Sequence, residues 1–141
     1  SVVFTNSKIE ALNKFSEGFK VGDYPLFYFY AQLGDVVYLG DVMGVYRIHN
    51  KGIWNERDEE KRLIDFLDTM LKLRERLSIT KHHKFNQELI DSYIRILEYY
   101  EKKDNIDSKK IYLQQIWPLL RFSTTKQKQV LFKFFIKNLL S

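Results

Sequence analysis

Apolar residues recur at steps of three and four along the second half of the chain, which is the spacing of one face of an α-helix. Four such runs are present, each with a charged reverse face, and they predict four helices that pack on one another or on the first part of the chain. The third is expected to end or kink between Pro118 and Ser123. The apolar positions are Leu63, Leu67, Met70, Leu73 and Leu77; Phe85, Leu89, Tyr93, Leu97 and Tyr100; Ile111, Ile116, Leu119 and Leu120; and Leu131, Phe134, Phe135 and Leu139.

The start of the chain has a different pattern. The β-branched run SVVF at 1–4 predicts a short strand. The segment 7–19 alternates apolar and polar residues with helical spacing, which predicts a helix. Ser7 is placed to be its N-cap, with Glu10 three residues later as the capping-box partner.

A second helix is predicted to open at Asp23, because Pro25 follows and proline is favoured in a first turn. Gly34 is expected to end this helix as a C′ glycine. Two apolar runs at 36–40 and 42–49 then predict two strands joined by a tight turn. The predicted order of this part is therefore strand, helix, helix, strand, strand.

Glycine usage divides the chain. All six glycines lie at or before Gly52, and the charged stretch that follows Trp54 has none. We place a boundary near residue 55 for this reason. The predicted fold is a mixed α/β unit over 1–55 followed by an all-α region over 56–141, so that the chain is mostly α overall.

Composition excludes several kinds of chemistry. The chain has no cysteine, which excludes disulfides, thiolate metal sites and cysteine nucleophiles. Hydrophobic residues make up 45% of the chain and aromatic residues 16%, enough to build an ordered core. No apolar run reaches about 18 residues, so no membrane-spanning helix is expected. The opening residues lack the basic and apolar regions of a signal peptide.

The net charge of +5 arises from 23 Lys and Arg against 18 Asp and Glu. Basic and acidic residues alternate in NERDEEKR and EYYEKKDNIDSKK, which is typical of a solvated helix surface, so no nucleic acid partner is expected. The last helix, by contrast, sets lysines beside aromatic residues and allows peripheral contact with a membrane surface. His82 and His83 lack a third ligand at metal spacing and are predicted to lie in an exposed loop.

Three residues of the first part could carry chemistry. Asp23 is either a helix cap or a catalytic base held on a rigid element. His49, at the end of a predicted strand, is either structural or exposed, or else it binds a divalent metal or a phosphate. Arg47 presents a planar guanidinium that suits phosphate oxygens. None of these residue types is specific on its own.

Their order and spacing are more specific. The segment GDYPLFYFYAQLGDVVYLGDVMGVYRIHNKGIW, residues 22–54, resembles the end of the catalytic domain of bacterial family 2 glycosyltransferases of the GT-A fold. The shared features are a Gly-Asp followed by an aromatic residue, a Leu-rich helix, and a strand that leads into V-M-x-V-Y-R-x-H-x-x-G-x-W. The opening SVVFTNS resembles the strand that precedes the acceptor-side helix in this family. The resemblance covers residues 1–55, and the helical remainder resembles the variable C-terminal extensions of such enzymes.

The resemblance implies transfer of a sugar from a nucleoside-diphosphate donor to a hydroxyl of a glycan or lipid-linked acceptor, with inversion, in cell-surface polysaccharide synthesis. Asp23 matches the acidic residue that acts as catalytic base in inverting members. His49 matches a histidine near the metal and the diphosphate. Arg47 and Trp54 lie in the segment that closes over the donor. Mg²⁺ or Mn²⁺ would serve the full-length enzyme.

The departure of the chain from the family is large: it has no Asp-x-Asp motif and no nucleotide-binding half. The resemblance therefore implies a C-terminal part of a longer enzyme, inactive and metal-free on its own. An uncovered strand edge would allow a homodimer. The expected location is the cytoplasm or the inner face of the cell membrane.

The alternative is a non-enzymatic α-helical interaction module. It predicts that Asp23 and His49 face unrelated surroundings. The glycosyltransferase hypothesis instead places these two side chains on one face, within about 10 Å of each other, because both would serve the same substrate site.

Overall fold

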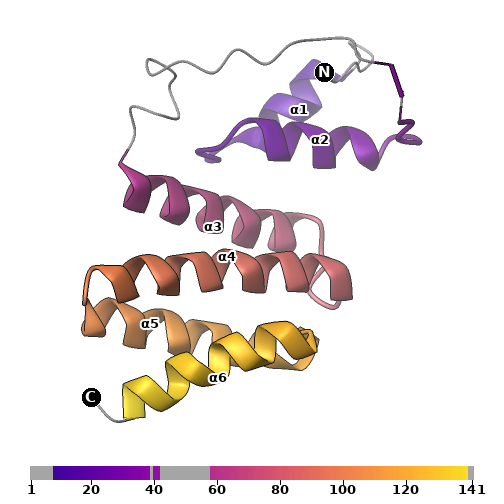
Figure 1. Cartoon of the computed structure of the whole chain (residues 1–141). Helices are drawn as coiled ribbons and strands as arrows, with labels where there is room; N and C mark the ends of the chain where they lie inside the picture. Colours follow the sequence, from indigo (N-terminus) through magenta and orange to yellow (C-terminus); the bar gives the residue numbers. More distant parts are fainter. Residues whose placement is uncertain (1–7, 39, 42–57, 140–141) are drawn as a thin grey trace.

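The computed structural model describes residues 8–38, 40–41 and 58–139. Within these ranges the chain forms six α-helices and one 3₁₀ helix, with no strand, so the described part is helical. The helices lie in successive layers: α1 with α2, then α3, then α4, and finally α5 with α6 (Figure 1). None of them is long and apolar enough to cross a lipid bilayer. Their bounds are α1 (Ile9–Ser16), α2 (Asp23–Ala31), α3 (Glu59–Arg76), α4 (His83–Lys102), α5 (Ile106–Ile116), η1 (Trp117–Phe122) and α6 (Thr125–Leu139).

Helix α4 forms the centre of the core. It packs on α3 on one side and on α5, η1 and α6 on the other. Because neighbours cover both sides, α4 is buried around most of its circumference, and Leu89, Ile90 and Leu97 have no exposed surface. Met70 and Leu73 of α3 fill the same core from the opposite layer. This continuous apolar contact is what holds α3 to α6 together.

The four helices predicted from the apolar spacing are confirmed. The third one ends where Pro118 predicts, because α5 gives way to the 3₁₀ helix η1 at Trp117. Two positions assigned to the core are wrong: Ile111 is 53% exposed and Leu139 is 83% exposed. On α5 the buried residues are Leu113 and Ile116, and Ile111 lies on a different face of the helix.

Local hydrogen bonds start two of the helices. The Asn105 side chain accepts a hydrogen bond from the Ser108 backbone N–H at 2.9 Å and caps α5. The Nδ1 atom of His82 accepts a hydrogen bond from the Phe85 N–H at 3.2 Å. His82 and His83 are exposed, as predicted; His82 lies in the connection before α4 as its N-cap, whereas His83 is the first residue of that helix.

The predicted start of the first helix is corrected. Helix α1 begins after Lys8, whose backbone has a left-handed conformation with φ 65°, and no side chain caps it. Ser7, the predicted cap, lies outside the described residues. The left-handed glycine of this part is Gly18, with φ 77°, directly after α1. Glycine accepts this conformation without the steric cost that a Cβ brings.

The predicted end of the second helix is also corrected. Helix α2 stops at Ala31, and the N–H groups of Gln32 and Leu33 close its last turn on the carbonyls of Phe29 and Tyr30, respectively. Gly34 is not in the left-handed region and does not end the helix. A turn closed by ordinary α-type residues needs no glycine, which explains the difference.

No strand is present at residues 36–38, within the predicted strand 36–40. The side chains of Val36, Val37 and Tyr38 are exposed there. A strand exists only when its backbone groups pair with a neighbour, and these residues pair with no other described segment. The predicted strands 1–4 and 42–49 lie outside the described residues.

Candidate site around Asp23

Asp23 is the first residue of α2, and the N-cap position before it is occupied by Gly22. Its side chain is exposed. A carboxylate in the first turn is stabilised by the positive end of the helix dipole. No hydrogen bond or ion pair joins Asp23 to another residue of the described part of the chain, and no side chain caps the helix. Asp23 is therefore not the cap of α2 but an accessible carboxylate.

The backbone on both sides of Asp23 is fixed by buried apolar side chains. Val21 and Pro25 are buried two residues before and two residues after it. Phe29, one turn after Pro25, is buried as well and lies 5.3 Å from the ring of Phe15 in α1. The α2 N-terminus is thus held in the hydrophobic layer while the carboxylate points into solvent.

Aromatic rings attach α2 to the layers beneath it. Tyr24 meets Phe66 of α3 in a T-shaped contact at 4.9 Å. Tyr28, one turn later, meets Phe85 of α4 at 5.6 Å, also edge to face. Such contacts add about 0.5–1.5 kcal/mol each beyond the area that they bury. They define both the distance and the rotation of α2 relative to α3 and α4.

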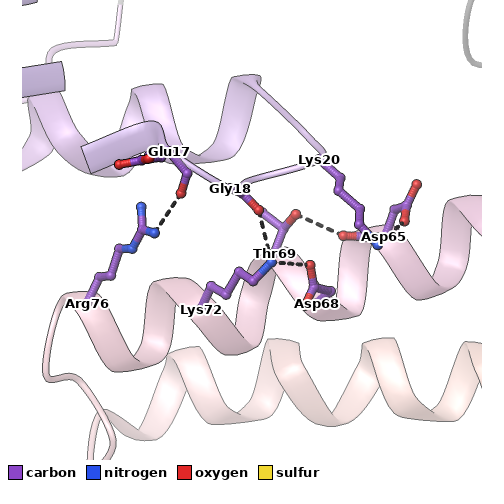
Figure 2. Close-up of polar contacts among 8 residues, drawn as sticks. All are labelled: Glu17, Gly18, Lys20, Asp65, Asp68, Thr69, Lys72 and Arg76. Atoms are coloured by element: carbon purple, nitrogen blue, oxygen red, sulfur yellow. Dashed lines mark hydrogen bonds and ion pairs between the residues drawn. The ribbon is translucent and has the colours of Figure 1, made fainter. Parts of the chain in front are cut away.

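Polar side chains of α3 hold the segment that leads into Asp23 (Figure 2). Lys72 donates to the Gly18 carbonyl at 2.9 Å and to the Asp68 carboxylate at 2.7 Å. Arg76 donates to the carbonyls of Glu17, at 2.6 Å, and Phe15. We refer to Asp65, Lys72 and Arg76 together as the α3 clamp.

The third member of the α3 clamp is a buried acid. Asp65 is only 3% exposed, and its carboxylate forms an ion pair with Lys20 at 3.2 Å. Buried Thr69, one turn further along α3, donates its hydroxyl to the Asp65 carbonyl at 2.8 Å. A buried carboxylate is costly without a partner, so this pair specifies where residue 20 docks. Residues 15–20 are thus held at the side chain of Lys20 and at the backbone carbonyls of residues 15, 17 and 18.

The α3 clamp is not among the sequence predictions, because the charged face of each predicted helix is expected to face solvent. On α3 this face is an interface, since α2 packs against it. Asp65, Thr69, Lys72 and Arg76 are separated by steps of four and three, the same spacing as an apolar stripe. A polar stripe with that spacing on a helix that already has an apolar stripe is the signal that would have revealed it.

Of the predicted site residues, the structure describes Asp23 alone. Arg47, His49 and Trp54 lie outside the described residues, so the expected approach of Asp23 and His49 stays a prediction. In residues 8–38, 40–41 and 58–139 no three His, Cys, Asp or Glu side chains are grouped closely enough to hold a metal ion. The described residues therefore form no metal site by themselves.

Comparisons with known proteins identify no relative of this chain. No protein-family model matches the chain, and no significant match was found among the curated proteins or the solved structures. The interpretation of Asp23 therefore depends on its own geometry and on the pattern of residues 22–54.

Proposed function

We propose that the chain is the C-terminal part of an inverting family 2 glycosyltransferase that uses a nucleoside-diphosphate sugar. The observation that supports this most directly is the exposed carboxylate of Asp23, set between buried Val21 and Pro25 at the start of a helix. Its position in the segment 22–54 is the position of the catalytic base in the family that the segment resembles.

In the proposed reaction the Asp23 carboxylate accepts the proton of the acceptor hydroxyl. The acceptor oxygen forms a bond to the anomeric carbon of the donor sugar as the bond from that carbon to the diphosphate oxygen breaks. The nucleoside diphosphate leaves with the electron pair, and attack from the opposite face inverts the configuration. An accessible carboxylate on a fixed backbone meets the geometric demand on a general base.

The other proposed roles follow from the resemblance. His49 would lie near the donor diphosphate, and Arg47 and Trp54 would close over the donor. A bound Mg²⁺ or Mn²⁺ would supply neutralisation of the departing diphosphate charge. The described residues do not form a site for that ion. The upstream half of the enzyme would have to supply the ion's carboxylate ligands.

The α3 clamp gives the helical extension a part in this proposal. It holds residues 15–20, and the buried Val21 then leads directly into the α2 N-terminus. Precise placement of a base relative to its substrate matters for rate, since small displacements reduce turnover strongly. The extension would therefore act on the acceptor side of the reaction by positioning Asp23.

The test is transfer from a panel of UDP- and GDP-sugars by the longer enzyme that includes the upstream half. Asp23→Asn removes the base and should lower turnover by about 10²–10⁴-fold with donor affinity retained. Asp107→Asn is the matched control, because Asp107 is likewise an exposed acid in the first turn of a helix. It should leave turnover unchanged.

Two results would contradict the proposal in different ways. Full turnover by the Asp23→Asn enzyme would remove Asp23 as base while leaving the transferase intact. Failure of the longer enzyme to bind or turn over any nucleotide sugar would remove the transferase itself. Turnover by the 141-residue chain alone would show that no upstream half is required.

A further inference from the structure

The net positive charge of the chain is concentrated in its last helices. Residues 106–139, which form α5, η1 and α6, contain seven Lys or Arg and one acid, Asp107, for a net charge of +6. The whole chain carries +5, so everything outside these helices sums to −1, with 16 basic and 17 acidic residues. The alternation of charge that argues against a nucleic acid partner thus ends within the first turns of α5.

The same helices expose large apolar side chains. Phe132, Ile136 and Leu139 of α6 are 64%, 41% and 83% exposed, and their spacing of four and three places them on one face. Leu131, on the other side of α6, is buried in the core. Trp117, which is 65% exposed, lies 5.6 Å from the ring of Phe135 at the border of this face. We call Trp117, Phe132, Ile136 and Leu139 the outer apolar face.

A shallow cavity adjoins the outer apolar face. It has a volume of about 470 Å³ and lies between α5 and α6. Its apolar lining is Leu113, Trp117, Pro118 and Phe135, and its polar lining is Lys110, Gln114 and Asn138. The cavity continues the apolar surface from α6 to α5 and gives it room for a flexible apolar chain.

Lysines flank the outer apolar face along one side and towards the start of α6. At 100° per residue, Lys128 lies almost in line with Phe132, while Lys126 and Lys133 lie to one side of it. These three exposed lysines form no ion pair with any residue in the described ranges. Lys137 has a different role, because it pairs with Glu101 of α4 and holds α6 in place. The face therefore combines an apolar stripe with uncompensated positive charge.

We propose that α5, η1 and α6 form a peripheral docking surface for an anionic lipid bilayer. The outer apolar face would enter the boundary between headgroups and acyl chains, with α6 parallel to the membrane plane. Trp117 suits this boundary because an indole ring is apolar with one polar N–H. The lysines would lie at the level of the lipid phosphates, and each adds roughly fivefold to binding at an anionic surface.

Charge and shape favour the bilayer over the other occupants. A second copy of the chain would bring its own unpaired Lys126, Lys128 and Lys133 close to those of the first copy, and these like charges repel. A nucleic acid would use the lysines and stack its bases on aromatic rings, but two of the three α6 residues in the stripe, Ile136 and Leu139, are aliphatic. This inference does not depend on the glycosyltransferase proposal.

The experiment is flotation of the 141-residue chain with lipid vesicles. Vesicles of phosphatidylcholine alone are compared with vesicles that also contain phosphatidylglycerol, at about 0.1 M salt, where the Debye length is about 10 Å. The chain should float with the anionic vesicles only, and less so as salt rises. In a Trp54→Phe background, the remaining Trp117 should show a blue-shifted and stronger fluorescence on the anionic vesicles.

Two double variants separate the apolar and the electrostatic parts. Phe132→Ser with Ile136→Ser removes the stripe and should weaken binding by about tenfold or more, because the burial of two large side chains is lost. Lys128→Glu with Lys133→Glu should weaken it by at least roughly 25-fold. Lys14→Glu with Lys61→Glu is the control of equal charge change, on α1 and α3, and should bind within about threefold of the parent.

All of these side chains are exposed, so each variant should keep the parent's thermal midpoint, which is measured alongside. Absence of flotation with anionic vesicles, or equal flotation with neutral ones, would overturn the proposal. So would loss of binding in the lysine variant with full binding in the stripe variant, since that pattern indicates a general polyanion site. Competition by duplex DNA at equal phosphate concentration would then identify nucleic acid as the partner.

Discussion

The two ends of the helical stack are attached by different kinds of contact. Helix α4 buries 11 of its 20 residues against its neighbours, and almost all of these contacts are apolar. Helix α1 has no buried residue, and the segment after it is held by lysine and arginine side chains on backbone carbonyls. The α4 interface therefore supplies most of the stability, whereas the polar contacts of α3 with the segment after α1 mainly fix its position. Hydrogen bonds contribute little net free energy but are directional.

Helix α3 belongs to both interfaces. Its face with Met70 and Leu73 is part of the core with α4, and its face with Lys72 and Arg76 holds the segment before α2. Because α3 is anchored in the core, it gives the more weakly attached α1 and α2 a rigid surface on which to pack. We therefore expect α1 and α2 to open locally at a lower free energy than the α3–α6 core unfolds.

The largest effect should come from the centre of the core. Leu97→Ala removes a side chain with no exposed surface from α4 and leaves a cavity, which should lower the free energy of unfolding by about 2–5 kcal/mol. Phe132→Ala, at an exposed site on α6, should change it by less than about 0.5 kcal/mol. Urea unfolding followed by circular dichroism measures both. Equal effects of the two changes would mean that α4 is not the centre of stability.

The second effect should be local. Lys72→Met with Arg76→Met keeps the aliphatic stems and removes the donors to the carbonyls of residues 15–18. The opening free energy of α1 and α2 should fall by about 1–2 kcal/mol, since charged hydrogen bonds at a solvated edge are worth about that much. Amide hydrogen exchange resolves the two layers. Protection in α4 should not change.

The matched control for the α3 clamp is Lys61→Met with Arg95→Met, which removes one lysine and one arginine from exposed sites on α3 and α4. It should leave exchange in α1 and α2 as in the parent. If the clamp variant leaves their protection intact, the polar contacts do not position this layer. If it lowers protection throughout α3 to α6, the two layers are one cooperative unit.

The difference between the two ends of the stack also explains which parts of the fold could be predicted from the sequence. The α3–α6 core was predictable because its stabilising residues are apolar and periodic, as with Leu89, Tyr93 and Leu97 on α4. The polar attachment was not, because Asp65 and Lys72 have the composition of a solvated surface, and only the chain fold brings residues 15–20 to them. The polar stripe on α3 marks that face as unusual, but nothing in residues 15–20 identifies them as the segment that it binds.

The candidate site was predictable in part. A first-turn acid before Pro25 correctly indicated a helix start at Asp23, but the cap position went to Gly22. Aspartate and glycine are both favoured at an N-cap, so local preference does not decide between them. The exposure of the Asp23 carboxylate follows from the burial of Val21 and Pro25 on either side of it, which depends on how α2 packs on α1 and α3. No local pattern predicts whether His49 lies near Asp23, because that depends on how the two segments pack in the folded chain.

A third prediction concerns a polar contact inside the core. Tyr100 of α4 donates its hydroxyl to Glu60 of α3 at 2.6 Å, and burial together with that carboxylate raises the pKa of Tyr100. Tyr100→Phe should lower the free energy of unfolding at neutral pH by about 1 kcal/mol. A raised pKa also means that this stability is present below the ordinary value of 10.0 and is lost as the pH rises above it.

The alkaline response gives this prediction a second readout. Between about pH 9 and pH 11 the parent should lose stability more steeply than Tyr100→Phe, which has no hydroxyl to ionise. Tyr38→Phe, at an exposed site, is the control and should follow the parent. Identical alkaline slopes in the parent and Tyr100→Phe would show that Glu60 and burial do not act on this hydroxyl.

The smallest effect is expected at the rim of the core, where Glu101 of α4 joins both C-terminal helices. Its carboxylate pairs with Lys109 of α5 at 2.7 Å and with Lys137 of α6 at 2.5 Å. Hydrogen bonds from Lys109 and then Lys137 lower the pKa of Glu101 below its ordinary value of 4.5. The stabilisation is therefore complete above that value and is lost as the pH falls through the lowered pKa.

Glu101→Gln should cost less than about 1 kcal/mol at neutral pH, because solvent screens these partly exposed pairs. It should also flatten the loss of stability below about pH 4.5, since the variant has no carboxylate to protonate. Glu98→Gln, at an exposed site one turn earlier on α4, is the control and should retain the parent's acid slope. Measuring the free energy of unfolding of the parent and both variants as the pH is lowered tests this prediction. A loss of several kcal/mol in Glu101→Gln would mean that polar contacts contribute as much to the α4 side as apolar ones, and the contrast between the two ends of the stack would not hold.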